Sequence, residues 1–196
     1  MSKIIPGKNA TKKDVITQKA AGLFITRGYN ATSMRELAQS VGVEAPSLYN
    51  HIGSKSELLQ DICSRIATSF TTHLDEVEKQ PMGSTAKLEN IIRFHIHMML
   101  EQYDEVFVAN HEWKHLLEPS LSEFLNRRRS YEKRLVALVE KGIQEKEFRN
   151  INPYVAVLNI LSAVRGLEFW HRHKKNVSSE ELEEDMVTHL LKGLTN

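Results

Sequence analysis

Apolar residues recur along the chain at the three- and four-residue spacing of amphipathic helices, and no segment alternates convincingly in the manner of a strand. The first such run covers residues 12–27 and stops at Gly28. A second run follows Thr32 or Ser33, either of which can act as the N-cap, and it ends at Gly42. The pattern therefore begins with two short helices separated by glycine stops.

Helical patterns continue to the end of the chain. Pro46 suits the first turn of a short third helix that reaches about Ile52, because its missing N–H costs nothing at that position. Ser54 then caps a long fourth helix, with Glu57 placed three residues later for a capping box. The further helical segments are residues 84–102, 104–117, 120–146, 152–171 and 179–193. The sequence predicts an all-α fold, in which a three-helix head is joined through the long fourth helix to a bundle of five or six helices.

Composition and charge narrow the class of protein. The chain has 196 residues, of which 41% are hydrophobic and 26% charged, as is typical of a folded globular protein. The single cysteine, Cys63, cannot form an internal disulfide, and no apolar leader or run of about 18 apolar residues occurs. We therefore expect a cytoplasmic protein that does not span a membrane.

Charge is distributed unevenly, although the whole chain carries only +1. Residues 1–60 contain eight Lys and Arg against four acidic residues, whereas the rest of the chain contains 18 basic and 21 acidic residues. A basic head on a mildly acidic body is expected if the head meets phosphate. A solvated basic face fits the same numbers, so charge alone leaves both interpretations open.

The segment SMRELAQSVGVEAPSLYNHI has the features of a helix-turn-helix, with Ala38 inside one helix, Gly42 at the turn and Val43 before a short second helix. Together with its flanks, the pattern AAGLFITRGYNATSMRELAQSVGVEAPSLYNHIGSKSELL resembles the TetR family of bacterial transcriptional repressors, and the match is close across residues 12–60. Ile52 stands where an aromatic residue is commoner in the family, a departure that affects packing. The resemblance implies a DNA-binding domain at residues 1–56.

The resemblance further implies that the short third helix enters the major groove of a double-stranded operator. Its first residues would face base edges, while Tyr49, His51 and Lys55 would face the sugar-phosphate backbone. Outside this motif, Tyr49 fits a core aromatic and His51 an ordinary surface histidine. The residues expected at DNA are Thr32, Ser33, Arg35, Glu44, Ala45, Pro46, Ser47, Tyr49, Asn50, His51 and Lys55.

For residues 57–196 the resemblance implies a domain that binds an effector and forms a homodimer by pairing its last long helices. The positions expected at the dimer interface are Val155, Leu158, Asn159, Ser162, Gly166, Leu182, Met186 and Leu190. Alternatively, these apolar and small residues pack inside the core of the monomer.

The stretch from Phe107 to Asn150, together with AVRGLEFWHRHKK, looks like the C-terminal domain of TetR-type regulators whose effectors are acyl-CoA thioesters. Such a ligand needs an apolar slot for its acyl chain and cations for its phosphates. The residues expected in the effector pocket are Phe94, Met98, Phe107, His111, Trp113, Arg127, Arg128, Tyr131, Arg165, Phe169 and Trp170. Core packing of the aromatic residues and a solvated face for the arginines remain alternatives.

The sequence contains one short pattern found in metal sites and none of the other enzyme motifs considered. No Gly-rich phosphate loop, Gly-x-Ser-x-Gly or Cys-x-x-Cys occurs. The stretch HEWKH at residues 111–115 matches His-Glu-x-x-His, but a histidine pair at this spacing is common by chance, and His111 and His115 lack further ligands in sequence. We therefore expect no catalysis, no metal and no cofactor.

The predicted function is that of a one-component transcriptional repressor, which binds a pseudo-palindromic operator as a homodimer and is released by a small molecule, best an acyl-CoA thioester. One alternative is a TetR-type regulator of an efflux or stress gene that responds to a hydrophobic compound. Another is a small-molecule binding module or enzyme whose helix-turn-helix is vestigial.

Overall fold

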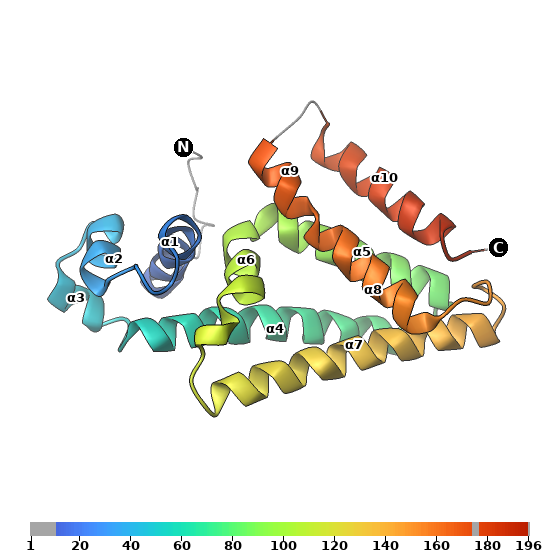
Figure 1. Ribbon diagram of the computed structural model, residues 1–196, viewed down its shortest axis with the longest axis horizontal. Coiled ribbons are helices and arrows are strands. Elements are labelled where there is room, and N and C mark those ends of the chain that lie inside the picture. The colour runs from blue at the N-terminus through green and yellow to red at the C-terminus, as the bar shows by residue number, and fades with distance from the viewer. Residues whose placement is uncertain (1–10, 174–176, 196) are drawn as a thin grey trace. The chain divides into compact units, whose positions relative to one another are not determined.

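The computed structural model describes residues 11–173 and 177–195, and within them the regular structure is helical apart from one isolated antiparallel bridge between Phe148 and Thr195. None of the described helices is long and apolar enough to cross a membrane. The segment expected over residues 104–117 is a helix followed by a 3-10 turn. The elements are α1 Lys12–Arg27, α2 Met34–Val41, α3 Ala45–Tyr49, α4 Lys55–Lys79, α5 Ser84–Glu101, α6 Tyr103–His111, η1 Trp113–His115, α7 Ser120–Gln144, α8 Pro153–Arg165, α9 Leu167–His173 and α10 Ser179–Lys192 (Figure 1). The predicted all-α fold is confirmed.

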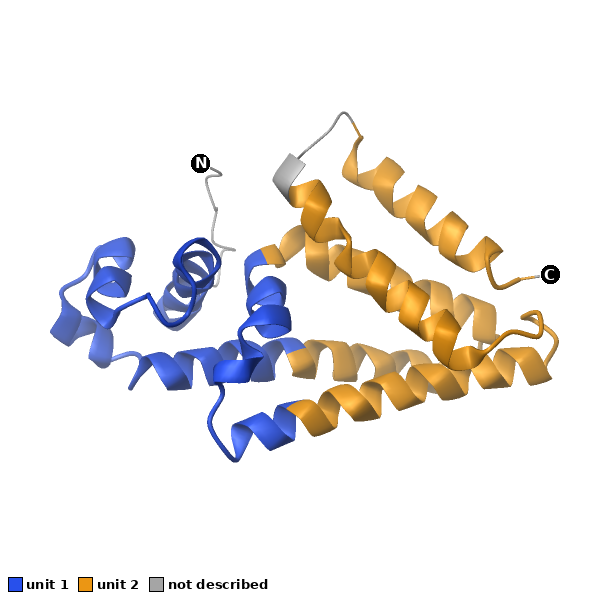
Figure 2. Cartoon of the chain, viewed as in Figure 1, with its two compact units in different colours: residues 1–66, 104–124 blue, residues 67–103, 125–196 orange. Residues whose placement is uncertain are grey.

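The chain divides into two compact units (Figure 2). Unit 1 comprises residues 1–66 and 104–124, and unit 2 comprises residues 67–103 and 125–196. The packing therefore continues past the boundary expected at residue 56, because the first half of α4 belongs with the head. Most of α6 and all of η1 also belong to unit 1, although they lie far along the sequence. As a result, α4, α6 and α7 each contribute residues to both units.

Unit 1 begins with two helices that each start with a capping box. The Thr11 hydroxyl accepts the N–H of Asp14 at 3.2 Å, and the Asp14 carboxylate accepts the N–H of Thr11 at 3.0 Å. Ser33 and Glu36 form the same reciprocal pair at the start of α2, at 3.2 and 2.8 Å. Each box satisfies two donors that the helix leaves unpaired, so the two starts are fixed locally. α1 then packs against α2, and α2 against α3.

In unit 2, α5 is the helix against which α8, α9 and α10 pack. Arg93 of α5 orients α10, since its guanidinium donates to Glu183 at 2.9 Å and to Glu184 at 2.7 Å. Arg134 of α7 donates in the same way to Asp75 of α4 at 2.6 Å. Ion pairs as exposed as these add little stability.

The segment expected to form one helix over residues 152–171 is broken at Gly166 into α8 and α9. Glycine supports a helical backbone poorly, and the N–H of Gly166 bonds to the carbonyl of Ser162 at the end of α8. The third helix is also shorter than expected and ends at Tyr49 rather than near Ile52. The expected starts of all the helices are otherwise close to the observed ones.

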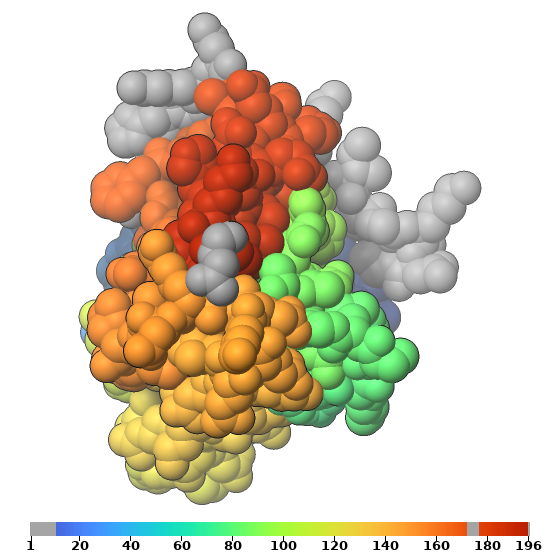
Figure 3. All heavy atoms as spheres, turned by 90° about the vertical axis from the view of Figure 1, so that its right-hand side faces the viewer, coloured from blue at the N-terminus to red at the C-terminus, as the bar shows by residue number. Residues whose placement is uncertain are grey.

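One end of unit 2 is closed by the turn that follows α7 (Figure 3). The ring of Phe148 lies where a Cβ at position 142 would be, so Gly142 gives the ring its place inside the unit. The N–H of Arg149 donates to the carbonyl of Leu194 at 2.9 Å, which joins this turn to the end of the chain that follows α10. The turn thus holds together segments that are far apart in the sequence.

Glu147 of the same turn caps α5. Its carboxylate accepts the backbone N–H of Thr85 at 2.7 Å and that of Ser84 at 2.9 Å. The residue at the N-cap position, Gly83, has no side chain to do this. The hydrogen bonds from Thr85 and then Ser84 lower the pKa of Glu147 below its ordinary value of 4.5. The start of α5 therefore depends on a carboxylate supplied from the turn that follows α7.

We expect Glu147→Ala to lower the free energy of unfolding by about 1 kcal/mol at pH 7, because two helix-start donors lose their acceptor. The folded-state pKa of Glu147 is lowered, so its contribution is complete above about 4.5 and is lost as the pH falls through the folded-state pKa. Urea unfolding at pH 7 and near pH 3 measures both effects. Glu140→Ala, an exposed position on α7, is the control and should change little. A loss that is the same at both pH values would contradict the capping role.

Candidate functional site

The helix-turn-helix forms because α2 ends at a glycine in the left-handed conformation. Gly42 has φ 80° and ψ 32°, and its N–H donates to the carbonyl of Ala38 at 3.0 Å. The N–H of Val43 donates to the same carbonyl at 3.0 Å. Residues with a Cβ are strained in this conformation, so Gly42 lets the chain turn sharply into α3. Pro46 stands in the first turn of α3, as the sequence predicts.

Most of the residues expected at DNA form an exposed row on α2, α3 and their flanks. Tyr49 is 53% exposed, so the core alternative for this aromatic does not hold. Its neighbour Leu48 is fully buried and anchors the short helix. The exposed members of the row are Ser33, Arg35, Glu44, Pro46, Tyr49, Asn50 and His51, while Ala45 and Ser47 are half-buried. The structure therefore brings together the side chains expected to face bases and those expected to face phosphate.

Thr32 does not belong to this exposed row. Its side chain is 2% exposed, and its hydroxyl donates to the carbonyl of Gly28 at 2.9 Å. Ser33, rather than Thr32, is the N-cap of α2. The burial of Thr32 argues against the expected side-chain contact with phosphate, because its hydroxyl is already used to close the turn between α1 and α2.

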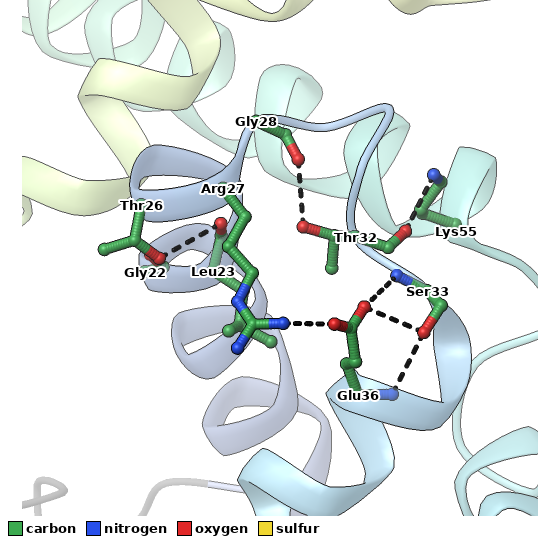
Figure 4. A network of polar contacts seen from close by, with 9 residues as sticks. All are labelled: Gly22, Leu23, Thr26, Arg27, Gly28, Thr32, Ser33, Glu36 and Lys55. Atoms are coloured by element: carbon green, nitrogen blue, oxygen red, sulfur yellow. Dashed lines mark hydrogen bonds and ion pairs between the residues drawn. The ribbon is translucent and has the colours of Figure 1, made fainter.

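Lys55 has a different environment from the one expected of a phosphate contact (Figure 4). Its ammonium donates to three backbone carbonyls, those of Tyr29 at 2.9 Å, Thr32 at 2.8 Å and Asn30 at 3.3 Å. An ammonium has three N–H donors, so this arrangement uses all of them. The geometry therefore argues against a direct phosphate contact by Lys55. Instead, the first residue of α4 fastens the turn that leads into α2.

Tyr29 is the centre of this connection and was not identified from the sequence. Its ring lies 4.5 Å from the ammonium of Lys55, stacks on His115 at 5.1 Å and meets Phe24 edge-on at 5.2 Å. Burial raises the pKa of Tyr29, opposed by a hydrogen bond with Ser56. A Gly-Tyr pair after α1 is visible in the sequence, but its contact with a histidine more than eighty positions later is not. Through this ring, η1 touches the turn before α2.

A second connection joins α6 to the head. The guanidinium of Arg65 in α4 donates to Asp14 of α1 at 3.0 Å and to Glu105 of α6 at 2.5 Å. Burial raises the pKa of Glu105, and the nearby charge of Arg65 opposes that rise. Arg65 therefore bridges three helices of unit 1. Together with the stacked Tyr29 and His115, it fixes α6 and η1 against α1, α4 and the turn before α2.

The residues expected in the effector pocket are divided between the two units. Phe107, His111 and Trp113 belong to unit 1, where the rings of Phe107 and His111 stack with their centroids 4.2 Å apart. Phe169 is 70% exposed, and Arg127 donates to the hydroxyl of Thr68 at 3.0 Å. The members that belong to unit 2 are Phe94, Met98, Arg127, Arg128, Tyr131, Arg165, Phe169 and Trp170. A single pocket lined by the whole set remains a prediction.

A polar pair lies among aromatic rings inside unit 2. Nε2 of His95 in α5 is 2.8 Å from the hydroxyl oxygen of Tyr131 in α7. The ring of Phe70 in α4 stacks on His95 at 4.5 Å, and Phe94 meets Phe70 edge-on at 5.6 Å. Three helices thus supply the walls around one hydrogen-bonded pair. Tyr131 and Phe94 were expected here from the sequence.

His95 was not expected at this site. It lies four residues after the buried Ile91 and four before the buried Met99, on the inner face of α5. This spacing is the feature of the sequence that could have identified it. Burial lowers the pKa of His95 to about 3, with smaller contributions from the charges of His73 and Arg165. Burial likewise raises the pKa of Tyr131. Both partners are therefore uncharged at neutral pH.

The positions expected at a dimer interface differ between the two helices that carry them. On α8, Val155, Leu158, Asn159 and Ser162 are all exposed, at the spacing of neighbours on one helix face. On α10, the expected positions Leu182, Met186 and Leu190 are half-buried within the protomer, while Val187 is buried. Gly166 is half-buried at the end of α8. The exposed apolar face is thus clearest on α8.

Within residues 11–173 and 177–195, no group of three or more His, Cys, Asp or Glu side chains is arranged to hold a metal ion. The two histidines considered as ligands have other contacts. His111 stacks on Phe107, and His115 lies 3.3 Å from Glu112 and stacks on Tyr29.

The replacement Lys55→Met tests whether Lys55 holds the fold or contacts DNA. We expect it to lower the free energy of unfolding by about 1.5–3 kcal/mol, because three carbonyls lose a charged donor. The slope of log affinity against log salt for non-specific DNA should stay unchanged. Arg35→Met is the matched control: Arg35 is exposed, so stability should change by less than about 0.5 kcal/mol, and the slope should fall by about one. A reduced slope with unchanged stability in Lys55→Met would refute the assignment.

Comparison with known proteins agrees with this architecture. Residues 16–62 match the family model of bacterial regulatory proteins of the tetR family, and residues 82–194 match the tetracyclin repressor-like C-terminal domain. The chain is 22% identical to the HTH-type transcriptional repressor KstR2 of Mycolicibacterium smegmatis, over 97% of this chain and 94% of that protein.

Solved structures extend the similarity to the fold. The ketosteroid transcriptional regulator KstR2 of Mycobacterium tuberculosis superimposes with a TM-score of 0.88 at 19% identity, covering 98% of this chain and 100% of that one. AibR, in complex with isovaleryl coenzyme A and operator DNA, superimposes with a TM-score of 0.79 at 24% identity, covering 92% and 98%. Because the match to the C-terminal domain model alone spans more than half of its length, the chain belongs to the TetR family of bacterial regulatory proteins and is a DNA-binding transcriptional regulator rather than an enzyme.

Proposed function

We propose that the chain is a one-component repressor, which binds a pseudo-palindromic operator as a homodimer and releases it when an acyl-CoA thioester binds. The observation that carries this proposal is the exposed row on α2 and α3. Tyr49 and Asn50 are exposed at the end of α3, which Leu48 anchors in the core, while the turn before α2 is closed by Thr32 and Lys55. A rigid head with free hydrogen-bonding side chains is suited to a groove of DNA.

The chemistry of the row suits both kinds of DNA contact. The Asn50 amide is exposed on the C-terminal side of α3, and an amide can bind adenine through two hydrogen bonds in the major groove. Arg35, Tyr49 and His51 carry N–H or O–H donors that suit phosphate oxygens. Phosphate contacts would fix the position of the head, whereas Asn50 would read sequence.

A homodimer supplies two such heads, related by a two-fold axis, for a pseudo-palindromic operator. The surface that supports dimerisation is the exposed face of α8, where Val155 is 47% and Leu158 49% exposed. Large apolar side chains that stay exposed on one face of a helix suit an interface with a second copy of the chain.

The effector class is supported by two independent facts. AibR, a structural relative with a TM-score of 0.79, is solved with isovaleryl coenzyme A, and the similarity covers 92% of this chain. Unit 2 also combines aromatic and apolar residues around a neutral polar pair with exposed arginines, among them Arg127 and Arg165. An acyl thioester needs both an apolar environment and cations for its phosphates.

The coupling between effector and DNA would run along the helices that contribute to both units. The residue that begins α6 belongs to unit 2, and the rest of the helix is fixed to the head through Arg65 and Glu105. A ligand that changes the position of α6 would change the setting of α1 and α4 through these contacts. The effector releases DNA only if it binds the DNA-free arrangement more tightly than the DNA-bound one.

This function is tested by selecting operator DNA from a random pool and measuring its release. We expect the pool to yield an inverted repeat, and at least one acyl-CoA among isovaleryl-, octanoyl- and benzoyl-CoA to weaken binding by about tenfold or more. Fluorescence anisotropy measures the affinity. Free CoA and the matching free acids are the controls and should have little effect.

The outcomes of this experiment separate the parts of the proposal. Failure to enrich any repeat would contradict the DNA-binding role. Enrichment of a repeat with unchanged affinity in the presence of every thioester would contradict the effector class while leaving the DNA-binding role in place.

The dimer is tested by placing a charge on α8. We expect Leu158→Asp to weaken self-association by about 30-fold or more, because a two-fold interface meets the buried charge twice. Sedimentation equilibrium measures the dissociation constant. Leu117→Asp is the matched control, since Leu117 is also a large exposed apolar residue, at 67%, but belongs to unit 1. An unchanged dimer in Leu158→Asp, or equal weakening in both variants, would place the interface elsewhere.

A further inference from the structure

The polar pair inside unit 2 holds more hydrogen-bond donors than its own contact uses. A neutral His95 carries one N–H and one lone pair, and Tyr131 carries one O–H. The two side chains share one hydrogen bond of 2.8 Å. If the hydroxyl donates, the other ring nitrogen of His95 keeps an unused N–H; if the ring donates, the hydroxyl keeps its O–H. Either tautomer leaves one donor that this contact does not use.

A second unused donor lies in the same unit. Nε1 of Trp170 in α9 is buried and has no hydrogen-bond partner among the described residues. Leaving a buried N–H unpaired is costly, and native proteins keep few such groups. α9 packs against α5, the helix that carries His95. The adjacent His171, by contrast, has its partner, because its Nε2 lies 2.7 Å from the carbonyl oxygen of Met99.

The surroundings of the pair indicate which kind of acceptor suits it. Its walls are aromatic, with the ring of Phe70 stacked on His95. Burial keeps both His95 and Tyr131 neutral at pH 7. A carboxylate brought into such a site would lose its hydration without gaining a charged partner from the pair. An uncharged carbonyl oxygen loses far less and accepts the same hydrogen bond.

We propose that the spare donor of the His95–Tyr131 pair and Nε1 of Trp170 bind carbonyl oxygens at the uncharged, apolar end of the effector. This deepens the proposed function and rests on it, since the ligand is the molecule that releases DNA. The class of ligand is an acyl group whose carbonyl belongs to a thioester or a ketone, rather than a free carboxylic acid. The unpaired donors are then binding groups whose partner arrives with the ligand.

The experiment uses the full-length protein and calorimetric titration with isovaleryl-, octanoyl- and benzoyl-CoA, the three free acids, CoA alone and 4-methyl-2-pentanone. The last compound keeps the carbonyl of the isovaleryl group but lacks CoA, so it separates the ketone source from the thioester source. We expect a thioester or the ketone to bind at least about tenfold more tightly than the corresponding acid.

Tyr131→Phe removes the hydroxyl alone and should weaken binding of the preferred ligand by about three- to tenfold. Tyr154→Phe removes the same group from an exposed position on α8 and should leave the affinity unchanged. Tyr131→Phe also takes a partner from His95, so its folding is checked by thermal unfolding. Trp170→Phe is the second variant and should weaken the ligand by a similar factor.

An independent readout is the indole N–H resonance of Trp170, assigned by its loss in Trp170→Phe and distinguished in this way from that of Trp113. The resonance should move downfield when the ligand provides an acceptor. Unchanged affinity in both variants together with an unmoved resonance, while a thioester still binds, would overturn the inference and leave the proposed effector class standing. If neither the thioesters nor the ketone bound, both this inference and the proposed effector class would be overturned. The measured operator binding would not be affected.

Discussion

The ammonium of Lys55 is the interaction on which the geometry of the head depends. Lys55 is the first residue of α4, and its three N–H groups reach the carbonyls of Tyr29, Asn30 and Thr32 in the turn between α1 and α2. Hydrogen bonds from a charged donor are stronger than those between neutral groups. The start of α4 and the start of α2 are therefore held together directly. The exposed row that begins at Ser33 takes its position from this contact.

The same contact explains why residues 104–124 belong to the head. The ring of Tyr29, whose carbonyl accepts from Lys55, also stacks on His115 of η1. Arg65 makes a second connection to this segment, because it bonds both Asp14 of α1 and Glu105 of α6. A segment in the middle of the sequence is thus fixed to α1, to α4 and to the turn that leads into α2. This gives the chain a physical route by which a change in α6 reaches α2 and α3.

The two units differ in whether the polar side chains discussed above have hydrogen-bond partners. In the head, Thr32, Ser33, Glu36 and Lys55 all have partners within unit 1, so the row they support is rigid. In unit 2, Trp170 keeps a buried donor without a partner. Such a donor lowers the stability of the free protein, and a ligand that satisfies it recovers that loss on binding. A buried donor that is left unpaired is expected of a binding site rather than of a packed core.

Local features of the fold were predictable from the sequence, because they depend on neighbouring residues. The capping box at Ser33, the glycine turn at Gly42 and the proline start at Pro46 follow from chemistry within a few positions. Features set by distant packing were not predictable. The sequence places Lys55 beside a helix start and so suggests phosphate, but three carbonyls more than twenty positions earlier take its donors.

The candidate effector residues show the same limit. Residue type suggested Phe107, Trp113 and Tyr131 together, yet the first two pack with the head and only the third belongs to unit 2. His95 was overlooked because a histidine on a helix is common, and its significance comes from burial and from its partner on α7. The break at Gly166 was likewise hidden by an apolar pattern that runs through it.

The central claim is that α6 and η1 transmit the state of unit 2 to the head, and hydrogen–deuterium exchange of the full-length protein tests it most directly. Exchange is measured with and without a thioester that binds. The account predicts that backbone amides in residues 28–33 and in residues 104–115 change their protection together when the ligand is added. Changes confined to residues 67–103 and 125–195, with the amides of both connecting segments unaltered, would contradict it.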